Sequence, residues 1–294
     1  MKADRIFAAA VMAAAAASAS LAALPARAAC MTDAQVSALF DAYNRAEPAA
    51  NPDELSTADG ECSRAKFNRM LALQLGDPVG YKAGLTNPAV QKRFNASAPV
   101  WGTLYGPMLL PNGARVAANF GARALFEADL LVRVSSTAVN RARTPQDVMA
   151  AIDQVIPFIE LPDLVVQAPG KLNGAAITAI NVGARLGVLG TPLPVPATRA
   201  ERFALQDALR DMTAIVMVDG AEADRGLGSD VLEHPLNAVV RLVQDMARHG
   251  VALKVGDVVS LGSFSKLLPP RPGMAVEVVY WGLPGTPKVQ VSFK

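Results

Sequence analysis

Two acidic side chains lie two residues apart in the segment LFEADLLVRV, residues 125–134. The apolar, β-branched composition of this segment predicts a strand, and alternate side chains of a strand point to the same face. Glu127 and Asp129 would therefore share one face, where like charges repel unless a cation, a proton or water relieves them. A solvated strand face is the simpler alternative, and the segment alone leaves both open.

A third acid, Glu160, ends the apolar run in AIDQVIPFIELPDLVV. A carboxylate beside a buried run needs a partner or a cation, because burying a bare charge is costly. Glu127, Asp129 and Glu160 would together form an all-oxygen site suited to Mg²⁺ or Mn²⁺. The chain has only two cysteines and two histidines, which cannot build a zinc site of the usual type. We therefore expect any metal to be a hard cation held by oxygen.

Lys82 lies between Gly80 and Gly84, where the backbone can approach a ligand closely. A lysine near a metal would suit a substrate with carboxylate and keto oxygens, and an exposed loop lysine is the alternative. The segment SLGSFSKLLPPRPG offers the hydroxyls of Ser263 and Ser265 after a predicted strand, although an ordinary turn would have the same composition.

The elements that must position these side chains divide the chain into two parts. Thr32 is a plausible N-cap of a helix that runs to about Glu47, and a second helix is predicted over residues 62–75. Beyond Val79, short β-like runs divided by Gly and Pro dominate, interrupted by helices that open at Thr144 and at His234. We expect an α+β fold with a helical N-terminal segment, residues 29–78, and a β-rich domain, residues 79–294.

The first residues have the pattern of a secretory signal. Lys2 and Arg5 precede a long alanine-rich run and a small-residue cleavage motif near Ala28, so residues 1–28 are expected to be removed; a membrane anchor is the alternative. The remaining 266 residues carry 25 basic and 25 acidic side chains, which gives no indication of a nucleic-acid partner. We expect an exported protein, periplasmic or secreted, without stable membrane insertion, in which Cys30 and Cys62 could form a disulfide.

Several of these segments occur in an order typical of one family. GYKAGLTNPAVQKRF, WGTLYGPML, FEADLLVRV, AIDQVIPFIEL and the long stretch from GLGSDVLEHPLNA to SLGSF resemble the 2-keto-4-pentenoate hydratase group of the fumarylacetoacetate hydrolase superfamily. The resemblance runs from about Val79 to Phe293. It implies a fumarylacetoacetate-hydrolase-like catalytic domain, a hydro-lyase of aromatic catabolism that acts on 2-hydroxy-dienoic or 2-oxo-enoic acids, and assembly into a homo-oligomer.

The resemblance also implies roles for matching residues. Glu127, Asp129 and Glu160 would hold Mg²⁺ or Mn²⁺, Lys82 would be the catalytic lysine, and substrate would be bound by Asn181 and Ser263. The substrate's C1 carboxylate and C2 oxygen would chelate the metal, which would stabilise the enolate as a Lewis acid. Lys82 would pair with the carboxylate or assist proton transfer.

Some polar positions of the group's pattern are altered in this chain. Asp129 stands where a glutamate is usual, Ile180 replaces an aspartate, Val165 an arginine and Leu261 a threonine. An exported, non-catalytic protein that binds metal and keto acid is therefore one alternative, and a decarboxylase or C–C hydrolase on the same scaffold is another. Hydrolysis is the least favoured reaction, because neither histidine lies in the His–Glu pattern of a lid helix.

Overall fold

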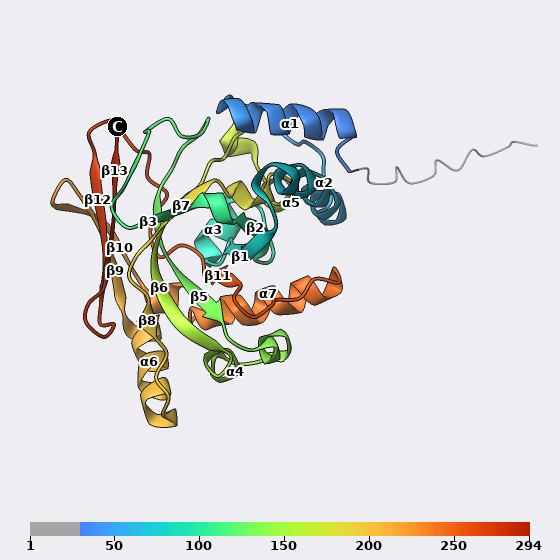
Figure 1. Cartoon of the computed structure of the whole chain (residues 1–294). Helices are drawn as coiled ribbons and strands as arrows, with labels where there is room; N and C mark the ends of the chain where they lie inside the picture. Colours follow the sequence, from blue (N-terminus) through green and yellow to red (C-terminus); the bar gives the residue numbers. More distant parts are fainter. Residues whose placement is uncertain (1–29) are drawn as a thin grey trace, which may run out of the picture.

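The computed structural model describes residues 30–294 (Figure 1). The predicted signal segment and its cleavage position near Ala28 lie outside these residues. Within the described range, none of the helices combines the length and apolar character that a membrane span requires.

The described chain opens with two helices, α1 (Asp33–Arg45) and α2 (Thr57–Leu75). Thr32 caps α1 as predicted: its hydroxyl accepts a 3.2 Å hydrogen bond from the Gln35 amide, and the Gln35 side chain accepts one of 2.8 Å from the Thr32 amide. A disulfide joins Cys30 to Cys62, with 5.6 Å between the Cα atoms, and attaches the start of the described chain to α2.

Helix α2 begins at Thr57, earlier than the predicted start at residue 62, and Gly60 lies inside it. A Cβ atom at Gly60 would lie 2.5 Å from the Ala175 carbonyl oxygen, so the glycine permits a close approach to α5 (Gly174–Ala179). The helix is capped by Ser56, whose hydroxyl accepts a 3.2 Å hydrogen bond from the Asp59 amide.

An eight-stranded mixed sheet forms the centre of the fold. Its strand order is β2-β1-β11-β5-β6-β7-β3, with β8 paired to β6. Strands β5 and β6 are antiparallel, and β11 lies between β5 and β1. The strands are β1 (Pro78–Gly84), β2 (Val100–Tyr105), β3 (Leu109–Pro111), β5 (Glu127–Val134), β6 (Ile152–Leu161), β7 (Leu186–Leu189), β8 (Leu193–Pro194) and β11 (Val258–Ser260).

A second sheet of five strands, ordered β10-β9-β12-β13-β4, packs beside the first and contains the C-terminus (Figure 1). Its strands are β4 (Ala114–Val116), β9 (Thr213–Val218), β10 (Ala221–Leu227), β12 (Ala275–Trp281) and β13 (Lys288–Phe293). Strands β9, β12 and β13 are among the β-like runs predicted beyond Val79; they lie in the segments MTAIVMVDG, AVEVVYWG and KVQVSF.

The remaining helices are α3 (Pro88–Arg93), α4 (Pro145–Met149), α6 (Arg199–Asp211) and α7 (Leu236–Arg248). The predicted starts of α4 and α7 are confirmed at Thr144 and at His234–Pro235. The sequence analysis missed α6, which Thr198 caps by accepting a 3.3 Å hydrogen bond from the Glu201 amide.

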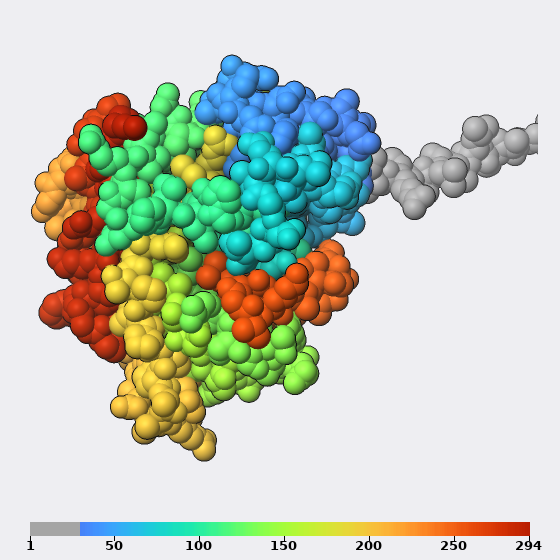
Figure 2. Space-filling model, viewed as in Figure 1, coloured from blue at the N-terminus to red at the C-terminus, as the bar shows by residue number. Residues whose placement is uncertain are grey.

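Two hydrophobic clusters hold these layers together. One lies between the sheets and under α7 and includes Ile159, Val216 and Leu242; the other lies between the large sheet and helices α1, α2 and α5 and includes Phe67 and Ile177. In Figure 2 the N-terminal helices form one blue and teal mass on the surface, with α7 in orange directly beside it.

Candidate metal and substrate site

Three of the predicted site residues meet on the buried face of the large sheet. Glu127 on β5 lies directly opposite Glu160 on β6, and the Lys82 ammonium group on β1 forms an ion pair with Glu160 Oε1. In a flat sheet β1 and β6, three strands apart, would be separated by at least about 14 Å. The ion pair therefore requires a strongly curved sheet whose concave face gathers these side chains.

All three groups are shielded from solvent, with Lys82 3%, Glu127 8% and Glu160 2% exposed. The exposed-loop alternative for Lys82 is thereby excluded. Burial, reinforced by the charge of Glu160, raises the pKa of Glu127 well above its ordinary value. Among residues 30–294, Glu160 Oε2 is one of the few buried polar atoms without a hydrogen-bond partner. An unpaired carboxylate oxygen facing a second buried carboxylate fits an oxygen-ligated divalent cation.

Asp129 shares this face but is held by the chain itself. It is fully buried, and its Oδ1 accepts hydrogen bonds from the amides of Leu130 (2.6 Å), Gly262 (3.0 Å) and Leu261 (3.2 Å), while Oδ2 accepts one from the Ser260 hydroxyl. Burial raises the pKa of Asp129 to about 7. In the described residues, Glu127, Asp129 and Glu160 do not gather into one set of ligand atoms within 4.8 Å. The role of Asp129 as a ligand stays a prediction.

Asn181 supports the neighbouring backbone. Its Oδ1 accepts a 2.8 Å hydrogen bond from the Thr103 backbone amide, and its Nδ2 donates one of 2.9 Å to the Thr103 carbonyl. The Asn181 side chain thus pairs with the Thr103 backbone as a neighbouring strand would. The next residue, Val182, adopts a left-handed φ of 54°, which is costly for a β-branched side chain. This turn directs the Val182 carbonyl to Lys82 Nζ at 2.9 Å. The substrate-binding role of Asn181 stays a prediction, and its observed contacts position the turn that holds Lys82.

A cavity of about 470 Å³ opens onto this face. Lys82, Glu127 and Ser263 supply polar groups to it, and Phe94 and Ile177 supply apolar walls. A mostly apolar cavity of this size with a few convergent polar groups is typical of a small-molecule site. Ser263 lines this cavity, and its substrate-binding role stays a prediction.

Two residues that the sequence analysis missed complete the arrangement. Ser260 holds Asp129 from β11, and the Val182 carbonyl holds Lys82. The Asn-Val-Gly order at residues 181–183 is a signal for a left-handed turn that could have indicated the second contact. No local signal marks Ser260, because its contact depends on the pairing of β11 with β5.

Comparison with known proteins identifies the family. The chain matches none of the known protein-family models. It is 30% identical over 193 residues to the 2-keto-4-pentenoate hydratase of Burkholderia vietnamiensis, covering 65% of this chain and 69% of that protein. The chain belongs to the 2-keto-4-pentenoate hydratase group of the fumarylacetoacetate hydrolase superfamily.

Two further comparisons agree with this membership. The Escherichia coli 2-oxo-hept-4-ene-1,7-dioate hydratase is 29% identical over 235 residues, which cover 77% of this chain and 84% of that one. The solved 4-oxalocrotonate decarboxylase of Pseudomonas putida G7, complexed with magnesium and adipate, superposes with a TM-score of 0.76 at 23% identity and covers 90% of this hydratase-group chain and all of that one. The predicted α+β, fumarylacetoacetate-hydrolase-like fold is confirmed.

The expected export of the protein is wrong. Related hydratases from Escherichia coli and Dechloromonas aromatica are cytoplasmic catabolic enzymes. A basic start and an alanine-rich run form a compositional pattern, and composition alone does not determine where a chain of this family acts.

Proposed function

We propose that this protein is a divalent-metal-dependent hydratase of 2-hydroxy-dienoic or 2-oxo-enoic acids. The observation that carries the proposal is the buried meeting of Lys82, Glu127 and Glu160 beside the cavity, with one Glu160 oxygen unpartnered. Its relatives at 26–30% identity have the names of hydratases and a decarboxylase of such acids. A structural relative is complexed with magnesium and adipate, a small dicarboxylic acid.

Glu127 and Glu160 are the proposed ligands of Mg²⁺ or Mn²⁺, with Asp129 as the third. The cation supplies a Lewis acid that stabilises negative charge on substrate oxygens. Asp129 is already oriented by Ser260 and three backbone amides, hydrogen bonds that favour its charged form, so it would be a pre-oriented third ligand. The shorter aspartate thus keeps the charge expected at this position of the family pattern.

Lys82 is the proposed proton carrier and carboxylate partner. Its ammonium group is fixed between Glu160 and the Val182 carbonyl and borders the cavity, so it can pair with a substrate carboxylate without a large side-chain movement. From this position Nζ can donate a proton to one carbon of the substrate chain and recover one from the adding water, while a second carbon takes up the proton that the enol hydroxyl releases. The apolar wall formed by Phe94 and Ile177 limits the access of other water molecules.

The test uses 2-hydroxypenta-2,4-dienoate. Hydration adds one water and yields 4-hydroxy-2-oxopentanoate, so the conjugated ultraviolet absorbance falls and the product mass rises by one water. We expect this change with Mg²⁺ or Mn²⁺, its loss with chelator, and a large loss of kcat in Lys82→Met and Glu160→Gln. Metal binding without turnover of this or longer dienoates would contradict the proposal and favour a binding protein.

A decarboxylase is the second candidate, since 4-oxalocrotonate decarboxylase of Pseudomonas putida is 26% identical over 231 residues. Release of CO₂ from a 2-oxo-dioic acid, with no addition of water, would favour it. We further propose that residues 29–78 form a helical segment on the catalytic domain of residues 79–294 and that the protein is a homo-oligomer. Light scattering of the purified protein tests the last point.

A further inference from the structure

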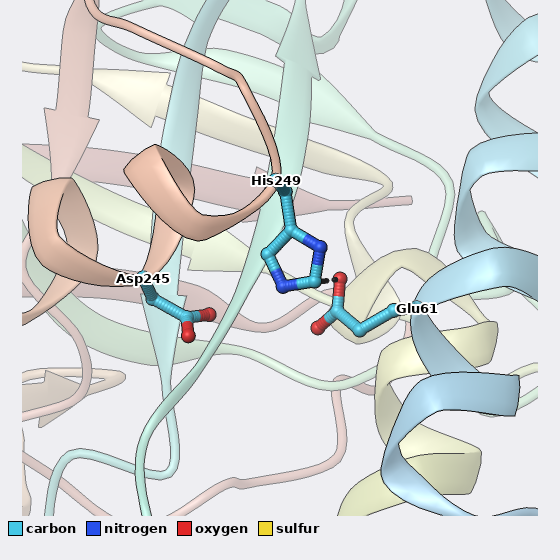
Figure 3. A group of neighbouring side chains, drawn as sticks. All are labelled: Glu61, Asp245 and His249. Atoms are coloured by element: carbon cyan, nitrogen blue, oxygen red, sulfur yellow. Dashed lines mark ion pairs between the residues drawn. The ribbon is translucent and has the colours of Figure 1, made fainter.

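A second group of possible metal ligands lies away from the cavity described above. Glu61 on α2, Asp245 on α7 and His249, the residue after α7, each offer one ligand atom within 4.8 Å of the others. Figure 3 shows the imidazole between the two carboxylates. Among residues 30–294 this is the one set of three or more carboxylate, histidine or cysteine side chains that converges so closely.

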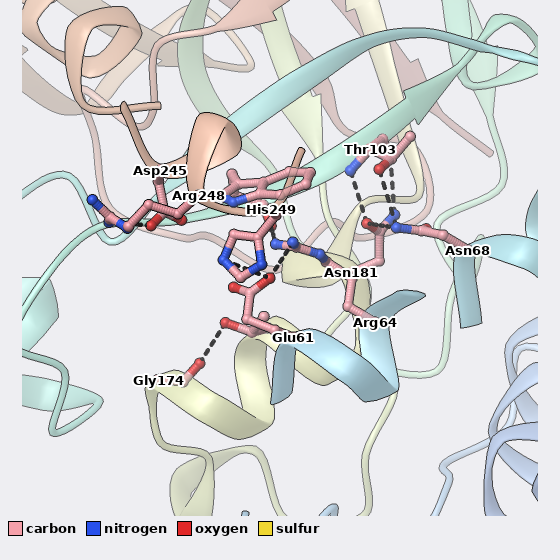
Figure 4. Close-up of polar contacts among 11 residues, drawn as sticks. Glu61, Arg64, Asn68, Thr103, Gly174, Asn181, Asp245, Arg248 and His249 are labelled. Atoms are coloured by element: carbon pink, nitrogen blue, oxygen red, sulfur yellow. Dashed lines mark hydrogen bonds and ion pairs between the residues drawn. The ribbon is translucent and has the colours of Figure 1, made fainter. Parts of the chain in front are cut away.

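The carboxylates are held by arginines that leave ligand atoms available. Arg64 pairs with Glu61 Oε2 and Arg248 with Asp245 Oδ1, so each guanidinium occupies one oxygen of its partner (Figure 4). His249 Nε2 lies 3.7 Å from Glu61 Oε2, which is beyond a hydrogen bond. Carboxylates that are oriented by such secondary contacts are typical of metal ligands.

Two buried polar atoms that line a cavity beside the cluster have no hydrogen-bond partner in the described residues. Glu61 and His249 border a cavity of about 620 Å³ that is also lined by Trp101 and Asn68. Trp101 is 5% exposed, yet its indole Nε1 makes no hydrogen bond within the described residues, and the same holds for Asn68 Oδ1. A buried N–H group without an acceptor is costly, so its presence at the cavity points to a bound acceptor.

We propose that Glu61, Asp245 and His249 form a second cation site, which binds a divalent transition metal and connects α2 to the end of α7. One imidazole and two carboxylates suit Zn²⁺, Co²⁺ or Mn²⁺ better than Mg²⁺, which prefers oxygen ligands alone. Three protein ligands leave positions open toward the cavity, where a water or small anion on the metal would accept the Trp101 N–H.

The charges of the cluster set its expected strength. The two arginines balance the two carboxylates, so the bound metal adds positive charge to a locally neutral group and the affinity is moderate.

The test exploits the two tryptophans of the chain. Trp281 is 65% exposed, and Trp281→Phe leaves Trp101, whose ring centroid lies 6.2 Å from that of His249, as the single tryptophan, which is excited selectively over the tyrosines at long wavelength. We expect Co²⁺ to quench this fluorescence saturably and Zn²⁺ to compete. In the same background His249→Gln or Asp245→Asn should weaken the effect by at least about tenfold.

Two controls separate this site from the proposed catalytic metal. Glu127→Gln should leave the Co²⁺ quenching of Trp101 intact. Asp207→Asn removes a carboxylate from another i,i+3 pair with an arginine, Arg210, which resembles the pair of Glu61 with Arg64. This variant should not change the quenching. Quenching that survives His249→Gln and Asp245→Asn, disappears with Glu127→Gln or never saturates would overturn the proposal. Both test residues lie at the end of α7, and circular dichroism checks that the variants fold.

Discussion

Replacement of Lys82 by methionine tests whether the charges of Lys82 and Glu160 compensate each other in the folded protein. Lys82→Met keeps the length and most of the volume of the side chain but leaves the carboxylate of Glu160 buried at 2% exposure with neither oxygen paired. Breaking a buried pair from one side costs about 3–5 kcal/mol, because the remaining charge is uncompensated. At about 2–4 °C per kcal/mol for a chain of this size, the melting temperature should fall by roughly 10 °C.

The matched variant is Lys82→Met with Glu160→Gln, which removes both charges and should recover most of the lost stability. Urea unfolding in the presence of chelator gives the free energy for wild type, both single variants and the double variant, and their cycle yields the coupling energy. Saturating Mg²⁺ should stabilise Lys82→Met more than wild type, because the cation would neutralise the orphaned carboxylate. A single variant as stable as wild type, or a double variant as unstable as Lys82→Met, would refute the reasoning.

Three further predictions concern other parts of the molecule. Gly60→Val places side-chain atoms against the Ala175 carbonyl and should destabilise the protein by about 1–3 kcal/mol in urea unfolding, whereas Gly170→Val, with open space around it and no left-handed φ, should cost less. Ser260→Ala removes a hydrogen bond from buried Asp129 and should raise the pKa of that carboxyl, detected by carboxylate infrared bands during a pH titration without metal; unchanged bands would contradict it. Burial holds the pKa of His234 below its ordinary 6.5, so the unfolded chain takes up a proton first as the pH falls. The stability that this group contributes is complete above about pH 6.5 and is lost below it, with a slope of up to about 1.4 kcal/mol per pH unit. His234→Gln should remove this slope from urea unfolding measured as a function of pH.

The parts of the site that follow from strand alternation could be read from the sequence. Glu127 and Asp129 share a face because β5 is regular, and both glutamates lie in strands whose apolar runs predict burial. The contact between Lys82 and Glu160 could not be predicted, because it depends on the curvature of a sheet that brings β1 and β6 together. The order β1-β11-β5 likewise places Ser260 beside Asp129 although 131 residues separate them.

Helices were predicted where the caps are local and missed where tertiary contacts decide. Thr32 and Thr144 stand directly before their helices and were sufficient signals. The start of α2 at Thr57 was missed: glycine destabilises helix interiors by about 1 kcal/mol, but at Gly60 the close packing against α5 outweighs that cost.

The second cluster, Glu61, Asp245 and His249, could likewise be predicted only in part from the sequence. Asp245 and His249 are four residues apart at the end of one helix, a spacing that places two ligands on one face and can be recognised in the sequence. Two ligands with one neighbouring arginine carry little information, because exposed helix ends commonly contain such residues. What turns the pair into a candidate site is Glu61, which reaches it because α2 contacts β2 and α7 contacts β1, and these two strands are paired at the edge of the sheet. Two cysteines and two histidines exclude a zinc site of the usual type, but they do not exclude one built from a single histidine and two carboxylates. A metal there would bind α2 to the catalytic domain, so its removal should loosen the N-terminal helices before it affects the sheet.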